Sequence, residues 1–129
     1  MIYIVDTYAW VEYLIGSKQG KILDNLLKNK QHKFITMECC IAELVGWTLK
    51  NNEDSNKVLD IIKHNSIILP VLTDHWKKAA ILRHEFRKKI PDFGLIDSIL
   101  VAKQQELKCK VISGDKHFKT LKDVVYVAA

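Results

Sequence analysis

Cysteine is scarce in this sequence, and the cysteines lack the spacing of a disulfide framework or a metal-binding motif. Cys39, Cys40 and Cys109 are the only three, and no two of them form a Cys-x-x-Cys pair. An odd count with this spacing argues against a disulfide framework and against a zinc site. It favours reduced thiols that pack in the protein interior. Metal-type spacing is also missing among the histidines, which we interpret as surface or packing residues: His32, His64, His75, His84 and His117.

Long apolar runs are missing as well. No segment approaches the length of a transmembrane helix, and the N-terminus lacks a basic segment followed by a signal-type apolar region. We therefore expect a cytoplasmic protein that does not contact membranes. Internal repeats, low-complexity tracts and signs of a second domain are absent too, so residues 1–129 are expected to form a single domain.

The composition is otherwise that of an ordinary soluble globular protein, with 48% hydrophobic and 27% charged residues. The chain is basic, with a formal net charge of +5 and a pI near 9.1. This charge points weakly to a polyanionic partner. A lysine-rich, solvated surface, as in proteins made for hot environments, explains it equally well.

Short apolar runs alternate with helical patterns along the whole chain. Strand-like runs occupy residues 2–6, 34–36, 66–69, 110–113 and 124–127. Between them, apolar residues recur at helical spacing, and residues 73–86 form the longest such stretch. Strands that alternate with helices through short connections predict one parallel sheet with helices on both faces.

Two helical patterns allow more specific expectations. Thr36 is expected to cap a helix whose apolar stripe includes Leu44 and Leu49. In the stretch opened by Thr73, Trp76 is expected to face the core.

Acidic residues occupy unusual places in this pattern. Asp6 ends the first apolar run, where it is as well suited to a ligand site at the sheet edge as to capping the next helix. Asp115 follows the fourth strand-like run, and Glu43 and Asp97 each lie beside an apolar stripe near the start of a helix. If the strands before Asp6 and Asp115 are neighbours, the acids meet at one edge of the sheet.

Carboxylates gathered in a partly buried pocket repel one another strongly unless something neutralises them. A divalent cation does so directly, and oxygen ligands favour Mg²⁺ or Mn²⁺. Such an ion can activate water and stabilise a phosphoryl transition state. The pattern therefore suits phosphodiester hydrolysis.

The motifs that contain these acids resemble those of the PIN domain family. They are Asp6-Thr7-x-x-Trp10 after a strand, Ala42-Glu43-Leu44, Asp97-Ser98-x-x-x-Ala102, and Ser113-Gly114-Asp115-x-x-Phe118. Each motif is common by itself. Their occurrence in this order over nearly the whole chain is much more specific.

This resemblance implies a three-layer α/β/α sandwich with a central, mostly parallel sheet of about five strands. It also implies a Mg²⁺-dependent endoribonuclease, in which Mn²⁺ is a possible substitute. Asp6, Glu43, Asp97 and Asp115 match the family's catalytic, metal-binding acids, and Thr7 and Ser113 match its accessory hydroxyl positions. Ser113-Gly114 stands where Thr-x-Asp is frequent in the family. Small chains of this kind most resemble the toxin of VapBC-type toxin–antitoxin pairs, which implies a homodimer, an RNA substrate and a cognate antitoxin.

Basic residues near the predicted site form two groups that suggest a weak RNA track. A solvated helix end, favoured by the helix dipole, is at least as good an interpretation of the group around residue 85. The residues concerned are Arg83, Arg87, Lys88, Lys116 and Lys119.

Other interpretations remain open. A haloacid-dehalogenase pattern needs a second Asp where Tyr8 stands, and a response-regulator receiver needs an acidic pair and a late Lys that are not clear here. Within the family, a nuclease of RNA maturation and a catalytically inactive RNA- or protein-binding module are alternatives. Asp92, after Pro91, is interpreted as a helix cap, whereas His117 follows Asp115 closely enough that it could line the cleft.

Overall fold

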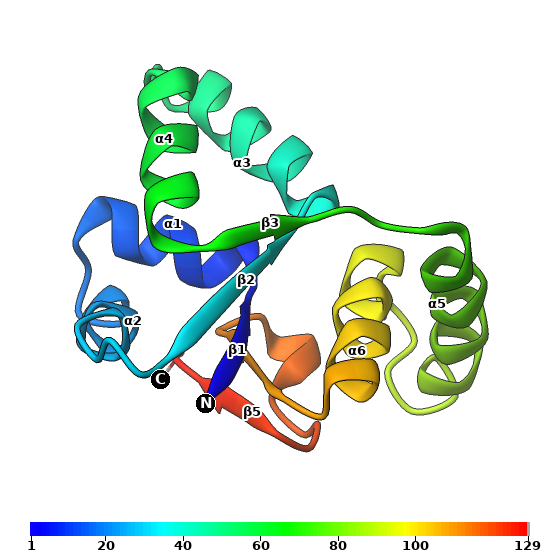
Figure 1. Ribbon diagram of the computed structural model, residues 1–129. Helices are drawn as coiled ribbons and strands as arrows, with labels where there is room; N and C mark the ends of the chain where they lie inside the picture. The colour runs from blue at the N-terminus through cyan, green and yellow to red at the C-terminus, as the bar shows by residue number, and fades with distance from the viewer. Residues whose placement is uncertain (129) are drawn as a thin grey trace.

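One five-stranded parallel sheet forms the centre of the molecule (Figure 1). The computed structural model describes residues 1–128. The strand order is β3-β2-β1-β4-β5, and every neighbouring pair is parallel. The strands are β1 (Ile2–Val5), β2 (Lys33–Met37), β3 (Ile67–Leu69), β4 (Lys110–Ser113) and β5 (Val124–Tyr126).

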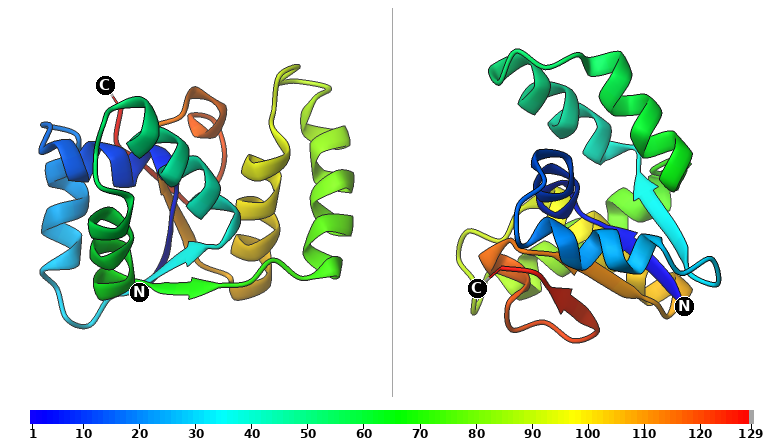
Figure 2. Two further views of the ribbon diagram at one scale, coloured as in Figure 1. Left: turned by 90° about the horizontal axis from the view of Figure 1, so that it is seen from above. Right: turned by 90° about the vertical axis from the view of Figure 1, so that its left-hand side faces the viewer.

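Helices cover both faces of this sheet, which confirms the expected three-layer α/β/α architecture (Figures 1 and 2). The first four helices in the chain lie toward one face and the next two toward the other. They are α1 (Thr7–Ile15), α2 (Gly20–Leu27), α3 (Cys39–Lys50), α4 (Ser55–Asn65), α5 (Thr73–Phe86) and α6 (Leu95–Leu107), and a 3-10 turn, η1 (Lys116–Phe118), follows β4.

Alternation along β1 shows why the sequence builds two cores. Ile4 joins the apolar cluster shared with α5 and α6, whereas Tyr3 and Val5 join the cluster shared with α1 and α2. Successive strand residues point to opposite faces, so an uninterrupted apolar run is needed where both faces are covered. β1 is therefore fixed between the two layers, and the residue that follows it has a fixed place at the sheet edge.

Thr36 does not cap the following helix as expected. β2 continues to Met37, and α3 begins at Cys39. Thr36 is fully buried, and its Oγ1 accepts a hydrogen bond from Trp10 Nε1 at 3.0 Å. The hydroxyl thus satisfies a buried indole N–H, which would otherwise be costly to leave unpaired.

Two apolar residues expected in the core are exposed. Leu49 is 71% exposed in the last turn of α3, where the α3–α4 pair extends away from the sheet (Figure 1). Trp76 is 40% exposed on α5, which packs chiefly against α6 at the flank of the molecule. Helical periodicity marks an apolar face, but it does not say whether the rest of the chain covers that face.

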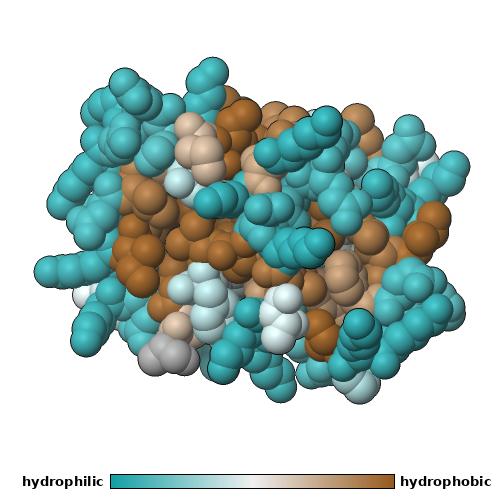
Figure 3. All heavy atoms as spheres, turned by 90° about the horizontal axis from the view of Figure 1, so that it is seen from below, coloured by the Kyte–Doolittle hydropathy of each residue, from teal (hydrophilic) through white to brown (hydrophobic). Residues whose placement is uncertain are grey.

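Apolar residues also reach the surface on the side seen from below, where hydrophilic residues surround them (Figure 3). Edge strand β5 lies on this side (Figure 1). Among residues 1–128, none of the helices has the length and apolar character that crossing a membrane requires.

Candidate metal centre

The central strand pair brings two of the predicted acids to one edge of the sheet. β1 pairs with β4 in the register Val5↔Ile112, and the backbone N–H of Asp6 donates to Ile112 O at 2.9 Å. Asp6 follows β1 directly, and Asp115 lies two residues beyond the end of β4. Both acids therefore lie at the carboxyl ends of neighbouring parallel strands, where α/β sheets place their ligand sites.

Asp6 is held by two hydrogen bonds and is only 5% exposed. Its Oδ1 accepts from the Thr7 backbone N–H at 2.7 Å, which makes Asp6 the N-cap of α1. Its Oδ2 accepts from Ser113 Oγ at 2.6 Å. Asp6 therefore caps the helix and also faces the other acids, so the two interpretations of this residue are compatible.

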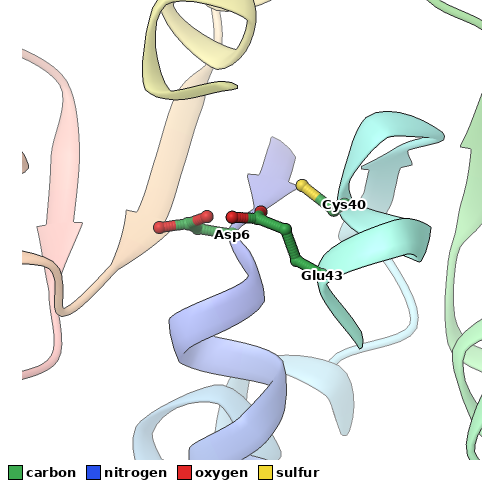
Figure 4. A group of neighbouring side chains, drawn as sticks. All are labelled: Asp6, Cys40 and Glu43. Carbon is green, nitrogen blue, oxygen red and sulfur yellow. The ribbon is translucent and has the colours of Figure 1, made fainter. Parts of the chain in front are cut away.

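Glu43 comes from the second turn of α3, and its carboxylate points toward Asp6 (Figure 4). Its Oε1 accepts a hydrogen bond from Thr7 Oγ1 at 2.8 Å. Cys40, one turn earlier on α3, places its sulfur within 4.8 Å of oxygens of Asp6 and Glu43. Contact with the Cys39 thiol and burial raise the pKa of Cys40 well above its usual value, so Cys40 stays a neutral thiol beside the acids.

Asp97 comes from the first turn of α6, and its charge acts on both Asp6 and Glu43. Its Oδ2 accepts from the Gly94 backbone N–H at 3.3 Å and lies 2.8 Å from His117 Nδ1. Asp115 caps η1 by accepting the His117 backbone N–H at 2.9 Å, and its Oδ1 is 3.4 Å from the same ring nitrogen. Asp97, Asp115 and His117 thus form a second close group, whose ligand atoms all lie within 4.8 Å of one another.

Gly114 is the residue that lets this edge of the sheet close. A Cβ atom at Gly114 would lie 2.2 Å from Cε1 of the Tyr8 ring. Any larger residue would push Tyr8 away or displace the turn that carries Asp115. Glycine at the position between Ser113 and Asp115 therefore has a packing reason here.

Burial, together with the charges of neighbouring acids, raises the pKa values of Asp6, Glu43 and Asp97. Burial raises the pKa of Asp6 from 3.8 to about 7, and the nearby charges of Asp97 and Glu43 add to this shift against the hydrogen bond from Ser113. Desolvation also raises the pKa of Glu43 and of Asp97, and both feel the charge of Asp115. The cluster is therefore short of positive charge, a condition that a bound cation relieves.

His117 lies at this site, as its spacing from Asp115 had suggested, and Asp92 lies beside it although the sequence had indicated a helix cap. Burial alone would lower the pKa of His117, but contacts with Asp92 and Asp97 outweigh it and raise that pKa. Its Nε2 lies 3.1 Å from Asp92 Oδ2. The signal in the sequence was the spacing of Asp115 and His117, which sets both on one turn of η1. The N-cap of α6 is Gly94, two residues after Asp92, so the interpretation of Asp92 as a helix cap is wrong.

The basic residues at the C-terminal end of α5 have contacts of their own. Arg87 donates from Nε to Phe93 O at 2.8 Å and so holds the loop that leads to α6. Lys88 pairs with Glu85 at 3.2 Å, and Arg83 is partly buried. These contacts explain the positions of these residues without a ligand, and their part in RNA binding stays a prediction.

The second basic group lies closer to the acids. Lys116 is in η1, directly after Asp115, and its Nζ is 3.7 Å from Asp92 Oδ2. Lys119 follows η1 and is exposed. This pair is therefore better placed than the α5 group to meet a polyanion at the acidic edge.

Comparison with known proteins identifies the family and the fold. The family model described as "PIN domain" matches residues 3–124. Among solved structures, a toxin–antitoxin complex from Klebsiella pneumoniae superposes with a TM-score of 0.75 at 17% identity and covers 97% of both chains. VapBC2 from Rickettsia felis, bound to a promoter DNA fragment, gives 0.73 at 21% identity, with 98% of this chain and 97% of that chain covered.

VapC20 from Mycobacterium tuberculosis, described as a Sarcin-Ricin loop cleaving toxin, gives a TM-score of 0.74 at 16% identity, with 95% of this chain and 96% of that chain covered. No curated protein matches the chain in sequence. At these identities the solved structures show a shared fold, whereas the family model matches nearly the whole sequence. The chain belongs to the PIN domain family.

Proposed function

We propose that this chain is a Mg²⁺-dependent endoribonuclease that hydrolyses RNA phosphodiester bonds. One observation carries the proposal: acids from four separate elements meet at the carboxyl edge of the sheet, and burial and neighbouring charges raise the pKa values of Asp6, Glu43 and Asp97. Membership of the PIN domain family supports the same reaction.

The residues present fit a divalent ion. Carboxylate oxygens are the donors that Mg²⁺ and Mn²⁺ prefer. Asp6 is the strongest case, because a buried carboxylate with a pKa near 7 is stabilised by any cation that reaches it. We assign Asp6 and Asp97 as direct ligands, with Asp115 and Glu43 completing the shell. A bound ion would supply Lewis acidity toward the phosphoryl group.

The chain's own residues orient these groups. Thr7 fixes Glu43, and Ser113 fixes Asp6, each through a hydroxyl that donates to the carboxylate. Glu43 is exposed and has a raised pKa, so it suits the role of accepting a proton from the attacking water. The water oxygen then bonds to phosphorus as the bond to the leaving ribose oxygen breaks, and that oxygen takes up a proton from solvent.

The biological role that we propose is that of a toxin in a toxin–antitoxin pair. The similar solved structures include toxin–antitoxin complexes and a toxin described as cleaving the Sarcin-Ricin loop, although the likeness alone establishes only the fold. A groove between α1, α3 and α4 offers a surface for an antitoxin segment. Its lining combines apolar residues with charged ones: Leu14, Ile15, Trp47, Val58 and Ile61, and Glu53, Asp54 and Lys57. We also propose that the protein is a single domain, that it is located in the cytoplasm and that it forms a homodimer.

A cleavage assay tests the reaction. Purified protein with Mg²⁺ is expected to cut a structured RNA, and EDTA is expected to stop the cutting. Asp6→Asn should lower the rate by roughly 10³-fold, which corresponds to the several kcal/mol that a catalytic ion supplies. Asp60→Asn, which alters an exposed acid on α4, is the matched control.

Cleavage that survives both EDTA and Asp6→Asn would show that the activity does not come from this site. A folded protein that cuts no RNA under any divalent ion would favour the inactive binding module instead. For the toxin role, expression should arrest growth, and co-expression of the neighbouring gene's product should restore it. Absence of growth arrest would favour a nuclease of RNA maturation.

A further inference from the structure

His117 is a nitrogen donor placed among oxygen donors, and its two ring nitrogens face different carboxylates. Nδ1 lies 2.8 Å from Asp97 Oδ2 and 3.4 Å from Asp115 Oδ1. Nε2, on the other side of the ring, lies 3.1 Å from Asp92 Oδ2. The imidazole therefore spans the distance between the largely buried acids and an exposed one.

This layout is that of a metal-binding histidine. Such a residue turns one ring nitrogen toward the ion and gives its other N–H to a carboxylate, which fixes both the tautomer and the direction of the ring. Asp92 occupies the position of the orienting carboxylate, and Nδ1 is the nitrogen that faces the acids. Nε2 makes no well-directed hydrogen bond to residues 1–128, but the exposed Asp92 carboxylate at 3.1 Å is close enough to accept one, whereas Nδ1 is in hydrogen-bond contact with Asp97.

The distances suit three ligands around one ion. Ligand atoms bound at about 2.1 Å lie at most about 4.2 Å from one another. One ligand atom each of Asp97, Asp115 and His117 already fall within 4.8 Å. Small rotations of the side chains are enough to close the group around a cation.

The ring is also held in place. The side chain of His117 is only 14% exposed, and its ring packs against Phe93 with the centroids 5.8 Å apart. Its own backbone N–H donates to Asp115 Oδ1 at 2.9 Å, which fixes the turn. An imidazole fixed by packing, backbone and carboxylate is preorganised for a ligand.

We propose that Asp97, Asp115 and His117 form a mixed oxygen–nitrogen position for a first-row transition-metal ion such as Mn²⁺, with Asp92 as the carboxylate that orients the imidazole. This inference rests on the proposed function in so far as a divalent ion binds at the acids. It adds that a nitrogen ligand sets the choice of ion. Mg²⁺ is a hard cation that prefers oxygen, whereas transition metals accept imidazole. The chain therefore binds Mn²⁺ more tightly than Mg²⁺.

Electron spin-echo spectroscopy of bound Mn²⁺ tests this assignment without any measurement of activity. The full-length protein loaded with one equivalent of Mn²⁺ should show coupling to a ¹⁴N nucleus. The coupling should change to that of ¹⁵N when only the histidines are labelled. It should disappear in His117→Gln and persist in His84→Gln, which alters an exposed histidine of α5.

Affinity provides a second measurement. His117→Gln should raise the Kd for Mn²⁺ by on the order of 10–100-fold, and Asp92→Asn by about 10-fold, since outer-shell partners contribute on this scale. The Kd for Mg²⁺ should change much less, because glutamine still offers an oxygen. Equal losses for the two ions would overturn the inference.

The outcomes separate the two proposals. Mn²⁺ that binds in an Asp6-dependent way but shows no nitrogen coupling overturns the role of His117 and leaves the proposed function intact. Failure of the wild-type protein to bind Mn²⁺ at all overturns both. Thermal unfolding shows whether His117→Gln is folded. If it is not, the spectrum of the histidine-labelled wild type and the Mn²⁺ affinity of Asp92→Asn test the inference instead.

Discussion

The two halves of the acidic cluster hold their carboxylates by different means. In the half built from β1 and α3, the hydroxyls of Ser113 and Thr7 donate to Asp6 and Glu43. In the half built from α6 and η1, an imidazole faces the carboxylates. A hydroxyl orients a carboxylate without altering the charge of the site, whereas an imidazole can carry a positive charge or donate a lone pair.

This difference shows which carboxylate is least favourable to bury in its charged form. Asp6 lies in the half without a basic side chain, and burial with neighbouring charges raises its pKa to about 7. For Asp97, desolvation raises the pKa, but the contact with His117 opposes the shift. The hydroxyl half would therefore gain most from an incoming cation, and in our proposal the imidazole half sets the choice of cation.

The largest effect should come from removing one acid in each half. Glu43→Gln and Asp97→Asn should each lower RNA cleavage by roughly 10²–10³-fold, because each weakens the hold on a catalytic ion. The double variant should lose no more than the worse single variant, since residues that act as a unit are not additive. Rates measured at one Mg²⁺ concentration test this, and two independent, multiplying losses would mean that the halves work separately.

The pH dependence of the free energy of unfolding should reveal what it costs to bury the Asp6 carboxylate in its charged form. Between pH 3.8, the ordinary pKa of this carboxyl, and about 7, the folded protein keeps a proton that the unfolded chain has lost. The free energy of unfolding should therefore fall as pH rises through this window, by up to about 4 kcal/mol, and then level off. Denaturant titrations in EDTA at several pH values measure this change.

Asp6→Asn should remove most of that slope and leave the variant more stable than the wild type above pH 7. Asp60→Asn should keep the slope of the wild type. Parallel stability curves for the wild type and Asp6→Asn would mean that burial costs Asp6 far less than its contacts indicate.

The hydroxyls should have smaller effects. Thr7→Val removes the donor to Glu43, and a hydrogen bond to a charged group contributes about 1.5–3 kcal/mol. Cleavage should fall roughly 10–100-fold as a result. Thr120→Val, at an exposed threonine after η1, should leave the rate unchanged. An unaltered rate in Thr7→Val would show that Glu43 needs no orientation.

The smallest effect should come from the basic pair beside the imidazole half. Replacing Lys116 and Lys119 by glutamine should weaken RNA binding uniformly across sequences. Each lost phosphate contact should reduce the salt slope by about 0.7 for a single strand. Binding titrations at several salt concentrations measure this slope, and an unchanged slope would place the RNA elsewhere.

The sequence predicted the site residues whose positions follow from the ends of strands. Asp6 ends an apolar run and Asp115 follows another, and parallel strands place such residues at one edge. The register of β1 with β4 brings Ser113 to Asp6, as the resemblance to the PIN domain implied. The alternation of strands and helices predicted a parallel sheet covered on both faces, and the resemblance of the four motifs predicted the family.

The features that the sequence did not predict depend on tertiary packing between segments far apart in the sequence. Asp92 meets His117 only because of the path of the loop before α6, which no periodicity encodes. Thr36 was assigned to the helix, but its hydroxyl is needed by the buried indole of Trp10. The exposure of Leu49 and Trp76 depends on which surfaces the chain leaves uncovered.

The central claim is that acids far apart in the sequence hold one kind of divalent ion together. Calorimetric titration of Mg²⁺ into the wild type and into Asp6→Asn, Glu43→Gln, Asp97→Asn and Asp115→Asn tests it most directly. We predict that the wild type binds Mg²⁺ and that every one of the four substitutions weakens this binding, whereas Asp60→Asn does not. Mg²⁺ binding that all four substitutions leave unchanged would contradict the claim.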